Sequence, residues 1–230
     1  MPEANDPLKA RDFCTNIGAF AAGTVLAWTS PAAPERLKSE YKIEVSTNEY
    51  SLIGSIATVG LAASCLPTGI LIDIIGRKLG MLIMVIPFIL GWALITWAAN
   101  VGMMVAGRFI IGFSGGTFCV AAPIYTAEIC ESEIRGALGS YFSLMLAGGI
   151  LYVYIIGSFI NLYILTIMCL LVPIIFAVTF FFMPESPMFL ISKGKTEQAA
   201  KSLQKLRGKH YNIEGEMRAM QQNRAFRTRK

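Results

Sequence analysis

Two long stretches of this sequence almost lack charged side chains. Between Gly136 and Met183 there is none, and between Leu79 and Ala127 the only one is Arg108. Each stretch is too long for one membrane-spanning helix of about 20 residues and suits two. The whole chain has 15% charged residues, against roughly a quarter in soluble domains. The missing charge therefore predicts bilayer spans rather than a soluble core.

The charge pattern predicts an all-α membrane protein with six spans. Asn100 and Asn161 mark the turns that divide the two stretches, and two further apolar runs precede them. The predicted spans cover about 13–31, 49–72, 79–99, 102–124, 137–157 and 162–183, with boundary errors of roughly 2–4 residues. Gly112 and Gly116 have the GxxxG spacing that lets helix backbones approach closely, and we interpret them as packing residues. Residues 1–183 would form the bundle and residues 184–230 a linker outside it.

Lysine and arginine in the short loops predict the orientation. Arg77 and Lys78 lie between spans two and three, Arg135 lies between spans four and five, and eleven basic residues follow span six. By the positive-inside rule these segments, with both termini, should be cytoplasmic. A basic tail can also bind nucleic acid. Beside several spans we interpret it as a cytoplasmic linker and expect no nucleic-acid partner.

The linker contains one readable helix, at about 196–207. Thr196 is the expected N-cap, and a narrow apolar stripe follows it, made of Ala199, Ala200, Leu203 and Leu206. The acid near its start and the bases near its end suit the helix dipole. We expect a short amphipathic helix docked on the bundle or on lipid headgroups. Beyond His210 no apolar periodicity is visible, and we expect weak order.

Residues suited to metal or covalent chemistry are scattered. Five cysteines form no CxxC pair, and the three within apolar runs are interpreted as small packing residues: Cys65, Cys119 and Cys169. The single histidine, His210, lies in the basic tail. The sequence also contains no HExxH or GxSxG motif. We therefore expect neither an enzyme nor a metal or other cofactor.

Four charged clusters lie at the predicted cytoplasmic ends of spans. They are Asp73-Ile-Ile-Gly-Arg77-Lys78, Pro123-Ile-Tyr-Thr-Ala-Glu128, Glu133-Ile-Arg135-Gly and Pro184-Glu185-Ser-Pro. Exposed ion pairs contribute about 0–1 kcal/mol each, whereas a partly desolvated network can bias a two-state element. Any one cluster is also explained as flanking charge. Together we interpret them as a gate made of Asp73, Arg77, Lys78, Glu128, Glu133, Arg135 and Glu185.

In this order and in these loops, the clusters resemble the signature of the sugar porter family of the major facilitator superfamily. The motif D-x-x-G-R-[RK] is shared across much of the superfamily. The motifs P-x-Y-x-x-E, E-x-x-R-G and P-E-S-P-x-[FWY]-L are those of sugar porters. The resemblance runs from span one to Gly208, and the segment 22–31 is similar to that of insect facilitated trehalose transporters. It implies sugar transport by alternating access, in the plasma membrane.

The resemblance also implies a role for each matching position. Arg77 and Lys78 would pair with acids of the fourth span and of the cytoplasmic segments. Glu128 and Arg135 would belong to the same inner gate. Glu185 would link the bundle to the cytoplasmic helix.

Arg108 lies inside the fourth span, where an arginine is energetically costly and by default indicates function. In proton-coupled sugar porters its partner is an acid in span one. Here that span has Asn16 and Thr24, and Asp12 lies at its cytoplasmic edge. The difference favours facilitated diffusion over proton symport. The alternative is a packing role, with Arg108 bonded to backbone carbonyls.

One departure from the family pattern falls in span five. Aligned on Gly149-Ile-Leu, Ser143 stands where sugar porters place a glutamine that hydrogen-bonds the sugar. A serine is shorter and offers one donor where an amide offers two, so recognition of the sugar can change strongly. We name Ser143, with Asn16 and Thr24, as candidate sugar contacts. The tyrosines of this span are interpreted as lipid-facing or core residues.

Major facilitator transporters have two six-span halves with the binding site between them near the bilayer midplane. The six predicted spans match the N-terminal half. The chain is interpreted as a fragment or mis-spliced form of a 12-span carrier, as a short isoform that pairs with another copy or a full-length relative, or as a decayed duplicate. The alternative function is a non-transporting regulatory partner of a full-length transporter.

Overall fold

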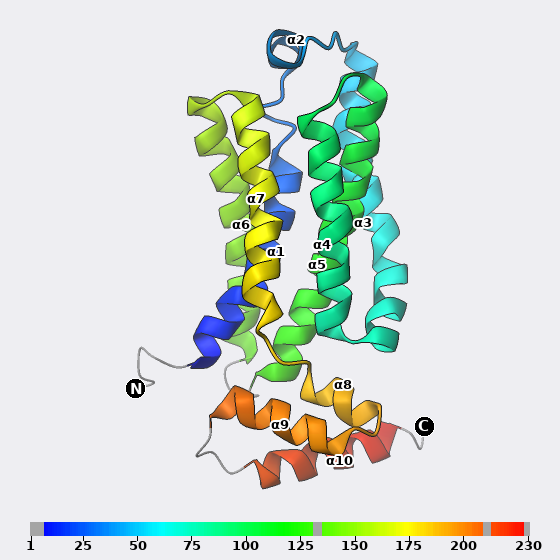
Figure 1. Cartoon of the computed structure of the whole chain (residues 1–230), viewed down its shortest axis with the longest axis vertical. Helices are drawn as coiled ribbons and strands as arrows, with labels where there is room; N and C mark the ends of the chain where they lie inside the picture. Colours follow the sequence, from blue (N-terminus) through cyan, green and yellow to red (C-terminus); the bar gives the residue numbers. More distant parts are fainter. Residues whose placement is uncertain (1–6, 131–134, 209–212, 228–230) are drawn as a thin grey trace.

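The computed structural model describes residues 7–130, 135–208 and 213–227, with the side chains of 14–130, 136, 139–208 and 213–222. Six long helices run side by side as a bundle (Figure 1). A short helix, α2, lies at one end, and three helices lie across the other. The predicted all-α bundle is confirmed. The helices are α1 (Pro7–Ala27), α2 (Pro34–Tyr41), α3 (Thr47–Ile75), α4 (Arg77–Thr96), α5 (Val101–Ile129), α6 (Arg135–Phe159), α7 (Leu162–Phe181), α8 (Pro187–Ser192), α9 (Thr196–Arg207) and α10 (Glu214–Arg227).

Among the described helices, α3 to α7 are long and apolar enough to cross a membrane, and α1 adds a shorter apolar stretch, Cys14–Ala27. Helix α1 ends four residues before the predicted bound of 31, because the chain turns before the proline there. Helices α3 and α5 run three and five residues past their predicted C-terminal bounds of 72 and 124. Asp73 and Glu128 therefore lie on the last turns of helices rather than in loops.

Helix α5 lies at the centre of the bundle, and glycines bring α3 against it. A Cβ atom built on Gly112 would stand 2.1 Å from the carbonyl oxygen of Ala57, and one on Gly60 would stand 2.4 Å from that of Phe109. The backbones of α3 and α5 are thus in direct contact. The GxxxG glycines do lie at a helix interface, as predicted, because small residues permit this approach. Gly23 of α1 and Gly149 of α6 make a second seam of this kind.

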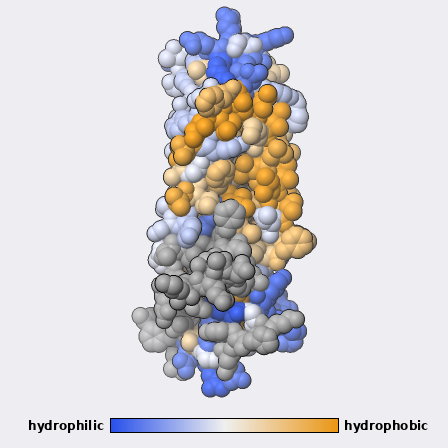
Figure 2. All heavy atoms as spheres, turned by 90° about the vertical axis from the view of Figure 1, so that its left-hand side faces the viewer, coloured by the Kyte–Doolittle hydropathy of each residue, from blue (hydrophilic) through white to orange (hydrophobic). Residues whose placement is uncertain are grey.

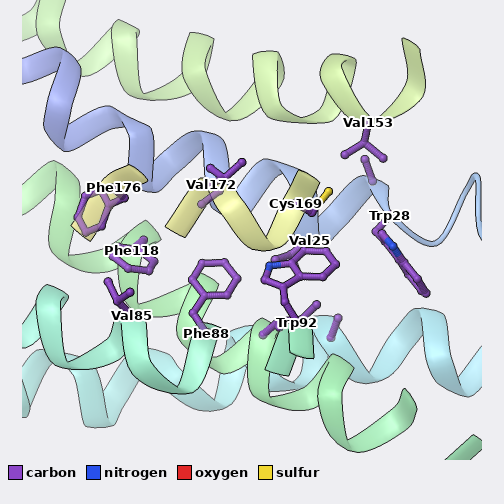
Figure 3. Packing of buried hydrophobic residues seen from close by; sticks show 14 of the residues in the cluster. Val25, Trp28, Val85, Phe88, Trp92, Phe118, Val153, Cys169, Val172 and Phe176 are labelled. Carbon is purple, nitrogen blue, oxygen red and sulfur yellow. The ribbon is translucent and has the colours of Figure 1, made fainter. Parts of the chain in front are cut away.

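Aromatic rings fill the space where α4, α5 and α7 meet. Phe118 stacks on Phe88 with ring centroids 5.6 Å apart and meets Phe176 edge-on at 4.9 Å (Figure 3). Phe176 in turn stacks on Phe180. These rings are fully buried. Offset and edge-on pairs of this kind add to the free energy of packing beyond the area they bury.

The sides of the bundle expose large apolar residues. Figure 2 shows, on one face of the molecule, an apolar region above the middle and hydrophilic side chains at both ends. The exposed residues come from α3, α4, α6 and α7. They include Leu66, Ile70, Ile86, Leu90, Leu144, Leu151, Ile175 and Val178. In water such a surface would be costly, and in a bilayer it contacts lipid chains. The chain is a multi-pass membrane protein.

Helix α2 fastens the turn between α6 and α7. Arg36 donates hydrogen bonds to the carbonyls of Gly157 (2.8 Å) and Ile160, at the end of α6. Glu40 accepts a hydrogen bond from the backbone N–H of Tyr163, in the first turn of α7. A cation at a helix C-terminus and an anion at a helix N-terminus are both stabilising, because each compensates the partial charge of the helix dipole at that end. Burial raises the pKa of Tyr41 to about 12, so its hydroxyl stays neutral beside Thr166.

The tail forms a three-helix layer beneath the bundle. Helix α9 has the predicted bounds of about 196–207. The prediction of weak order beyond His210 was wrong, because α10 runs from Glu214 to Arg227. Ile213, Met217 and Met220 recur at helical spacing and pack on α8 and α9, a signal that is sparse among polar neighbours. Glu216 of α10 also pairs with Arg207, whose side chain is only 2% exposed.

We expect Arg207→Ala to release α10 from the layer. Arg207 bonds both Glu216 oxygens and the carbonyl of Ile129 at the end of α5. Removing one partner of a buried pair costs about 3 kcal/mol, so local opening should become roughly a hundredfold more frequent. Limited proteolysis should show faster cleavage near residue 214. Arg218→Ala is the matched control, since its pair with Glu214 is exposed and contributes little; equal cleavage of both variants would contradict the expectation.

Candidate functional site

Gly76 forms the joint between α3 and α4 at the α8–α10 end of the bundle. Its φ of +106° and ψ of 159° lie in a region that is essentially restricted to glycine. It also leaves room for a carboxylate, because a Cβ atom here would stand 2.4 Å from Oε2 of Glu185. The position therefore requires glycine for two independent reasons, backbone conformation and space.

Glu185 caps the N-terminus of α4 from a distant part of the chain. Its Oε1 accepts hydrogen bonds from the backbone N–H groups of Arg77 and Lys78, both at 3.1 Å. The same oxygen accepts one from the N–H of Ser186 at 2.8 Å. The first N–H groups of a helix have no partner within the helix, and their dipole favours an anion. The carboxylate thus holds the chain after α7 against the joint between α3 and α4.

The side chain of Arg77 joins three helices. One terminal nitrogen lies 3.0 Å from Asp73 Oδ1 and 3.0 Å from Glu128 Oε1. The guanidinium also donates to the carbonyl of Ile72 (3.0 Å) and lies over the ring of Phe189. The Arg77 side chain is 13% exposed and Glu128 19%, so this pair is screened much less than one on the surface. The arginine links α3, α5 and α8.

Glu128 and Tyr125 attach α5 to the segment after α7. The hydroxyl of Ser186 donates to Glu128 Oε2 and also caps α8 by accepting from the N–H of Phe189. The Tyr125 hydroxyl donates to the carbonyl of Pro184 at 2.6 Å. Sequence reasoning named Glu128 and missed Ser186 and Tyr125. Both lie within the motifs P-x-Y-x-x-E and P-E-S-P, and this position in a motif is the signal that could have identified them.

Of the three remaining predicted gate residues, Lys78 is the one whose side chain is described. Lys78 makes no ion pair among the described residues; its ammonium donates to the carbonyl of Phe181 at 2.7 Å. Glu133 lies outside the described residues. Arg135 begins α6, and its side chain is not among those described. We call Asp73, Arg77, Glu128, Glu185 and Ser186 the linker lock.

Arg108 is buried in α5 towards the α2 end. Its three guanidinium nitrogens donate to the carbonyl of Ile53 (3.1 Å), the carbonyl of Val25 (2.8 Å) and the hydroxyl of Thr29 (2.8 Å). The guanidinium also lies over the ring of Trp28. Val25 is in the last turn of α1, where carbonyls lack helical partners and a cation is favoured. All three acceptors are neutral, and together they bind α5 to α1 and α3.

The candidate sugar contacts are divided between the interior and the surface. Asn16 is 1% exposed, and Thr24 is buried with its hydroxyl on the carbonyl of Ala21. Ser143 is exposed on α6. It belongs to an exposed stripe of small or polar residues on one side of that helix: Ser140, Ser143, Ala147, Tyr154 and Ser158.

A parallel line on α6 carries the exposed apolar residues Leu144, Leu151 and Ile155. Helix α3 shows the same division, with a small or polar exposed line of Ser51, Ser55, Thr58, Ala62 and Cys65. The spacings of three, four and seven residues place each line along one side of its helix. The apolar lines are suited to contact with lipid chains. The lines of small or polar residues are suited to contact with protein or water. We call the latter the polar lines. Among the described residues, no group of His, Cys, Asp and Glu has the arrangement of a metal site.

A six-span bundle with motif charges at one end and two polar lines on its side has the form of one half of a major facilitator transporter. The solved structures agree. The proton:xylose symporter XylE bound to 6-bromo-6-deoxy-D-glucose superimposes with a TM-score of 0.86 at 20% identity, over 95% of this chain and 53% of XylE. The inward-open form of XylE from E. coli gives 0.81. At this identity the likeness establishes the fold.

The sequence comparisons establish the family. The family model "Sugar (and other) transporter" matches residues 15–229, and the chain belongs to that family. It is 33% identical to the facilitated trehalose transporter Tret1 of Drosophila erecta over 211 residues, which are 91% of this chain and 25% of Tret1. It is 34% identical to human solute carrier family 2, facilitated glucose transporter member 6, over 92% of this chain and 42% of that protein.

The chain therefore spans less than half the length of these curated relatives and corresponds to their N-terminal half. Its relatives are transporters and not enzymes.

Proposed function

We propose that this chain forms the N-terminal half of a sugar carrier that moves a hexose or trehalose by facilitated diffusion through alternating access. The observation that carries the proposal is the linker lock, which joins α3, α4, α5 and the segment after α7 through charged side chains. Such bonds can form in one conformation and break in another, as a gate requires. In the predicted orientation the lock faces the cytoplasm, and the plasma membrane is the proposed location.

The exposed polar lines of α3 and α6 support the proposal, because each is a surface that a second bundle could cover. Ser143 lies on the α6 line, so its hydroxyl is available to a sugar between this half and a second one. Helices whose apolar line contacts lipid and whose polar line contacts a partner bundle suit a carrier with its site between two halves. Asn16 and Thr24 are buried within the bundle and would act by supporting α1 rather than by touching the sugar.

The bonding of Arg108 supports facilitated diffusion rather than proton coupling. Its donors are bound by two carbonyls and a hydroxyl, none of which exchanges a proton near neutral pH. We expect sugar uptake to be unchanged when a pH gradient is imposed across the vesicle membrane. Uptake driven uphill by such a gradient would contradict this proposal.

The decisive experiment measures uptake of labelled glucose and trehalose into vesicles that contain this chain, alone and together with a full-length relative. Uptake above that of empty vesicles would exclude a purely regulatory role. The alternative function is that of a non-transporting regulatory partner of a full-length transporter. No uptake by the chain alone, with reduced flux through the co-expressed relative, would establish that alternative.

In the preparation that supports uptake, we expect Ser143→Gln to lower the half-saturating sugar concentration. The amide restores a second donor on the polar line of α6, and one net hydrogen bond corresponds to roughly a three- to tenfold change in affinity. Ser158→Gln is the matched control, since it makes the same change on the same line near the α2 end. An equal effect of both substitutions would show that Ser143 has no special relation to the sugar.

A further inference from the structure

The aromatic ring of Phe189, in the first turn of α8, lies close to two cations. The guanidinium carbon of Arg77 is 5.2 Å from the ring centroid, and the ammonium of Lys193 is 5.5 Å from it. A cation within about 6 Å of an aromatic face is attracted by the negative potential of the ring, and more strongly where water is excluded. The Arg77 side chain is 13% exposed, whereas Lys193 lies in the exposed turn after α8. The ring should therefore attract Arg77 more strongly than Lys193.

The ring has little freedom to move. The backbone N–H of Phe189 donates to the hydroxyl of Ser186 at 3.2 Å, and its carbonyl accepts from the hydroxyl of Ser192 at 2.7 Å. The residue is 8% exposed. A Cβ atom built on Gly76 would stand 3.0 Å from the ring carbon Cε1, so the ring lies directly against the joint between α3 and α4. Phe189 thus presents a fixed aromatic surface beside Arg77.

The hydrogen bonds of the Arg77 guanidinium lie along its edges. Its N–H groups point outward in the plane of the group. They donate to Glu128, to the carbonyl of Ile72 and to Asp73. The Asp73 side chain is 70% exposed, so that pair contributes little. The flat faces of a guanidinium make no hydrogen bonds, and an aromatic ring is the side chain suited to bind such a face. The ring of Phe189 therefore supplies a contact that the hydrogen bonds do not.

We propose that Phe189 is a positioning residue of the linker lock, and that its ring holds the Arg77 guanidinium by cation–π attraction in the orientation that binds Glu128. The ring and the Glu185 carboxylate lie on the same segment after α7. Movement of that segment would withdraw the cap of α4 and the support of Arg77 together, so the lock opens as one unit. This inference rests on the proposed function only for the role of the lock as a gate.

The test weakens the attraction and leaves the shape of the ring nearly unchanged. Phe189 is replaced by mono-, di- and trifluorophenylalanine in the purified full chain in detergent, because each added fluorine lowers the negative potential of the ring face. The readout is hydrogen exchange at the backbone N–H groups of residues 77 and 78, which Glu185 caps. Exchange should accelerate with each fluorine and become roughly fivefold faster with three, as expected for loss of about 1 kcal/mol of cation–π attraction.

Two variants that remove charge identify the cation that the ring binds. In Lys193→Gln the dependence of exchange on fluorination should persist, because this lysine is the exposed one of the two cations. In Arg77→Gln the dependence should disappear. Phe189→Leu keeps an apolar side chain and loses the ring, so it should exchange at least as fast as the trifluoro form.

Equal exchange in all the fluorinated forms would show that the ring only fills space, and would overturn the proposal. A dependence on fluorination that is lost in Lys193→Gln and kept in Arg77→Gln would also overturn it, since the ring would then bind the lysine. Exchange is measured in detergent without sugar. The expected pattern of exchange, together with an absence of sugar uptake, would support the position of Phe189 and count against the gate.

Discussion

Gly112→Ala should melt several degrees below the unsubstituted chain in detergent. The added Cβ atom would stand 2.1 Å from the carbonyl oxygen of Ala57, which belongs to the backbone and cannot rotate away. Helices α3 and α5 must then separate along a seam that also includes Gly60. Overpacking of this kind costs about 3 kcal/mol, and the measurement is the fraction of monodisperse protein left after heating.

Gly115→Ala provides the matched control on the same helix. A Cβ atom there would find its nearest neighbour, in Ala22, at 3.7 Å, which is an ordinary contact. Alanine has a higher helix propensity than glycine by up to about 1 kcal/mol, so this variant should melt at the same temperature or above it. The two neighbouring glycines should therefore respond with opposite signs. A similar loss in both would show that the α3–α5 seam does not limit stability.

Gly76→Ala should release the segment after α7 from the bundle. The substitution strains a backbone conformation that costs a non-glycine residue about 1–3 kcal/mol, and it places a methyl group 2.4 Å from the Glu185 carboxylate. Glu185 must then leave the N–H groups of Arg77 and Lys78. We expect a lower melting temperature, faster proteolysis between residues 184 and 195, and loss of sugar uptake in any preparation that shows it.

Gly194→Ala separates the effect of backbone strain from the effect of the clash with the Glu185 carboxylate. Gly194 also has a positive φ, of 77°, but no atom of the part of the chain that the structure describes lies within 4 Å of the position of its Cβ. This control should show backbone strain alone, with the linker lock intact. Adding Glu185→Ala to Gly76→Ala should cost little more, because the carboxylate has already lost its place and effects within one network are not additive. Full additivity of the two substitutions would contradict this account of the joint.

The bundle could be predicted because the cost of charge in a bilayer acts on every residue of a span. Gly136–Met183 and Leu79–Ala127 therefore indicated four spans by composition alone. Helix α10 was not predicted, since three apolar residues at helical spacing among polar ones give a weak signal and its docking depends on α8 and α9. Helix α2 was missed for a similar reason, because it is short, polar and held by bonds to α6 and α7.

The sequence predicted which residues form the site, but only partly which groups those residues bind. The motifs named Arg77, Glu128 and Glu185, and a charged residue near membrane helices usually has a polar partner nearby. They did not indicate that Glu185 would bind backbone N–H groups rather than a basic side chain, or that Lys78 would bind a carbonyl. Every residue has a backbone carbonyl and almost every residue a backbone N–H group, so the sequence does not show which of these groups a charged side chain will bind.

The position of Glu185 in the chain bears on how the protein assembles during synthesis. The N-terminus of α4 receives its cap from a residue 108 positions later. At about 5–20 residues per second, the ribosome delivers that residue roughly 5–20 s after α4 begins to emerge. During that interval the first helices lie in the membrane with the joint at Gly76 uncapped. The joint between α3 and α4 is therefore completed only after the last span and the segment that follows it have been synthesised.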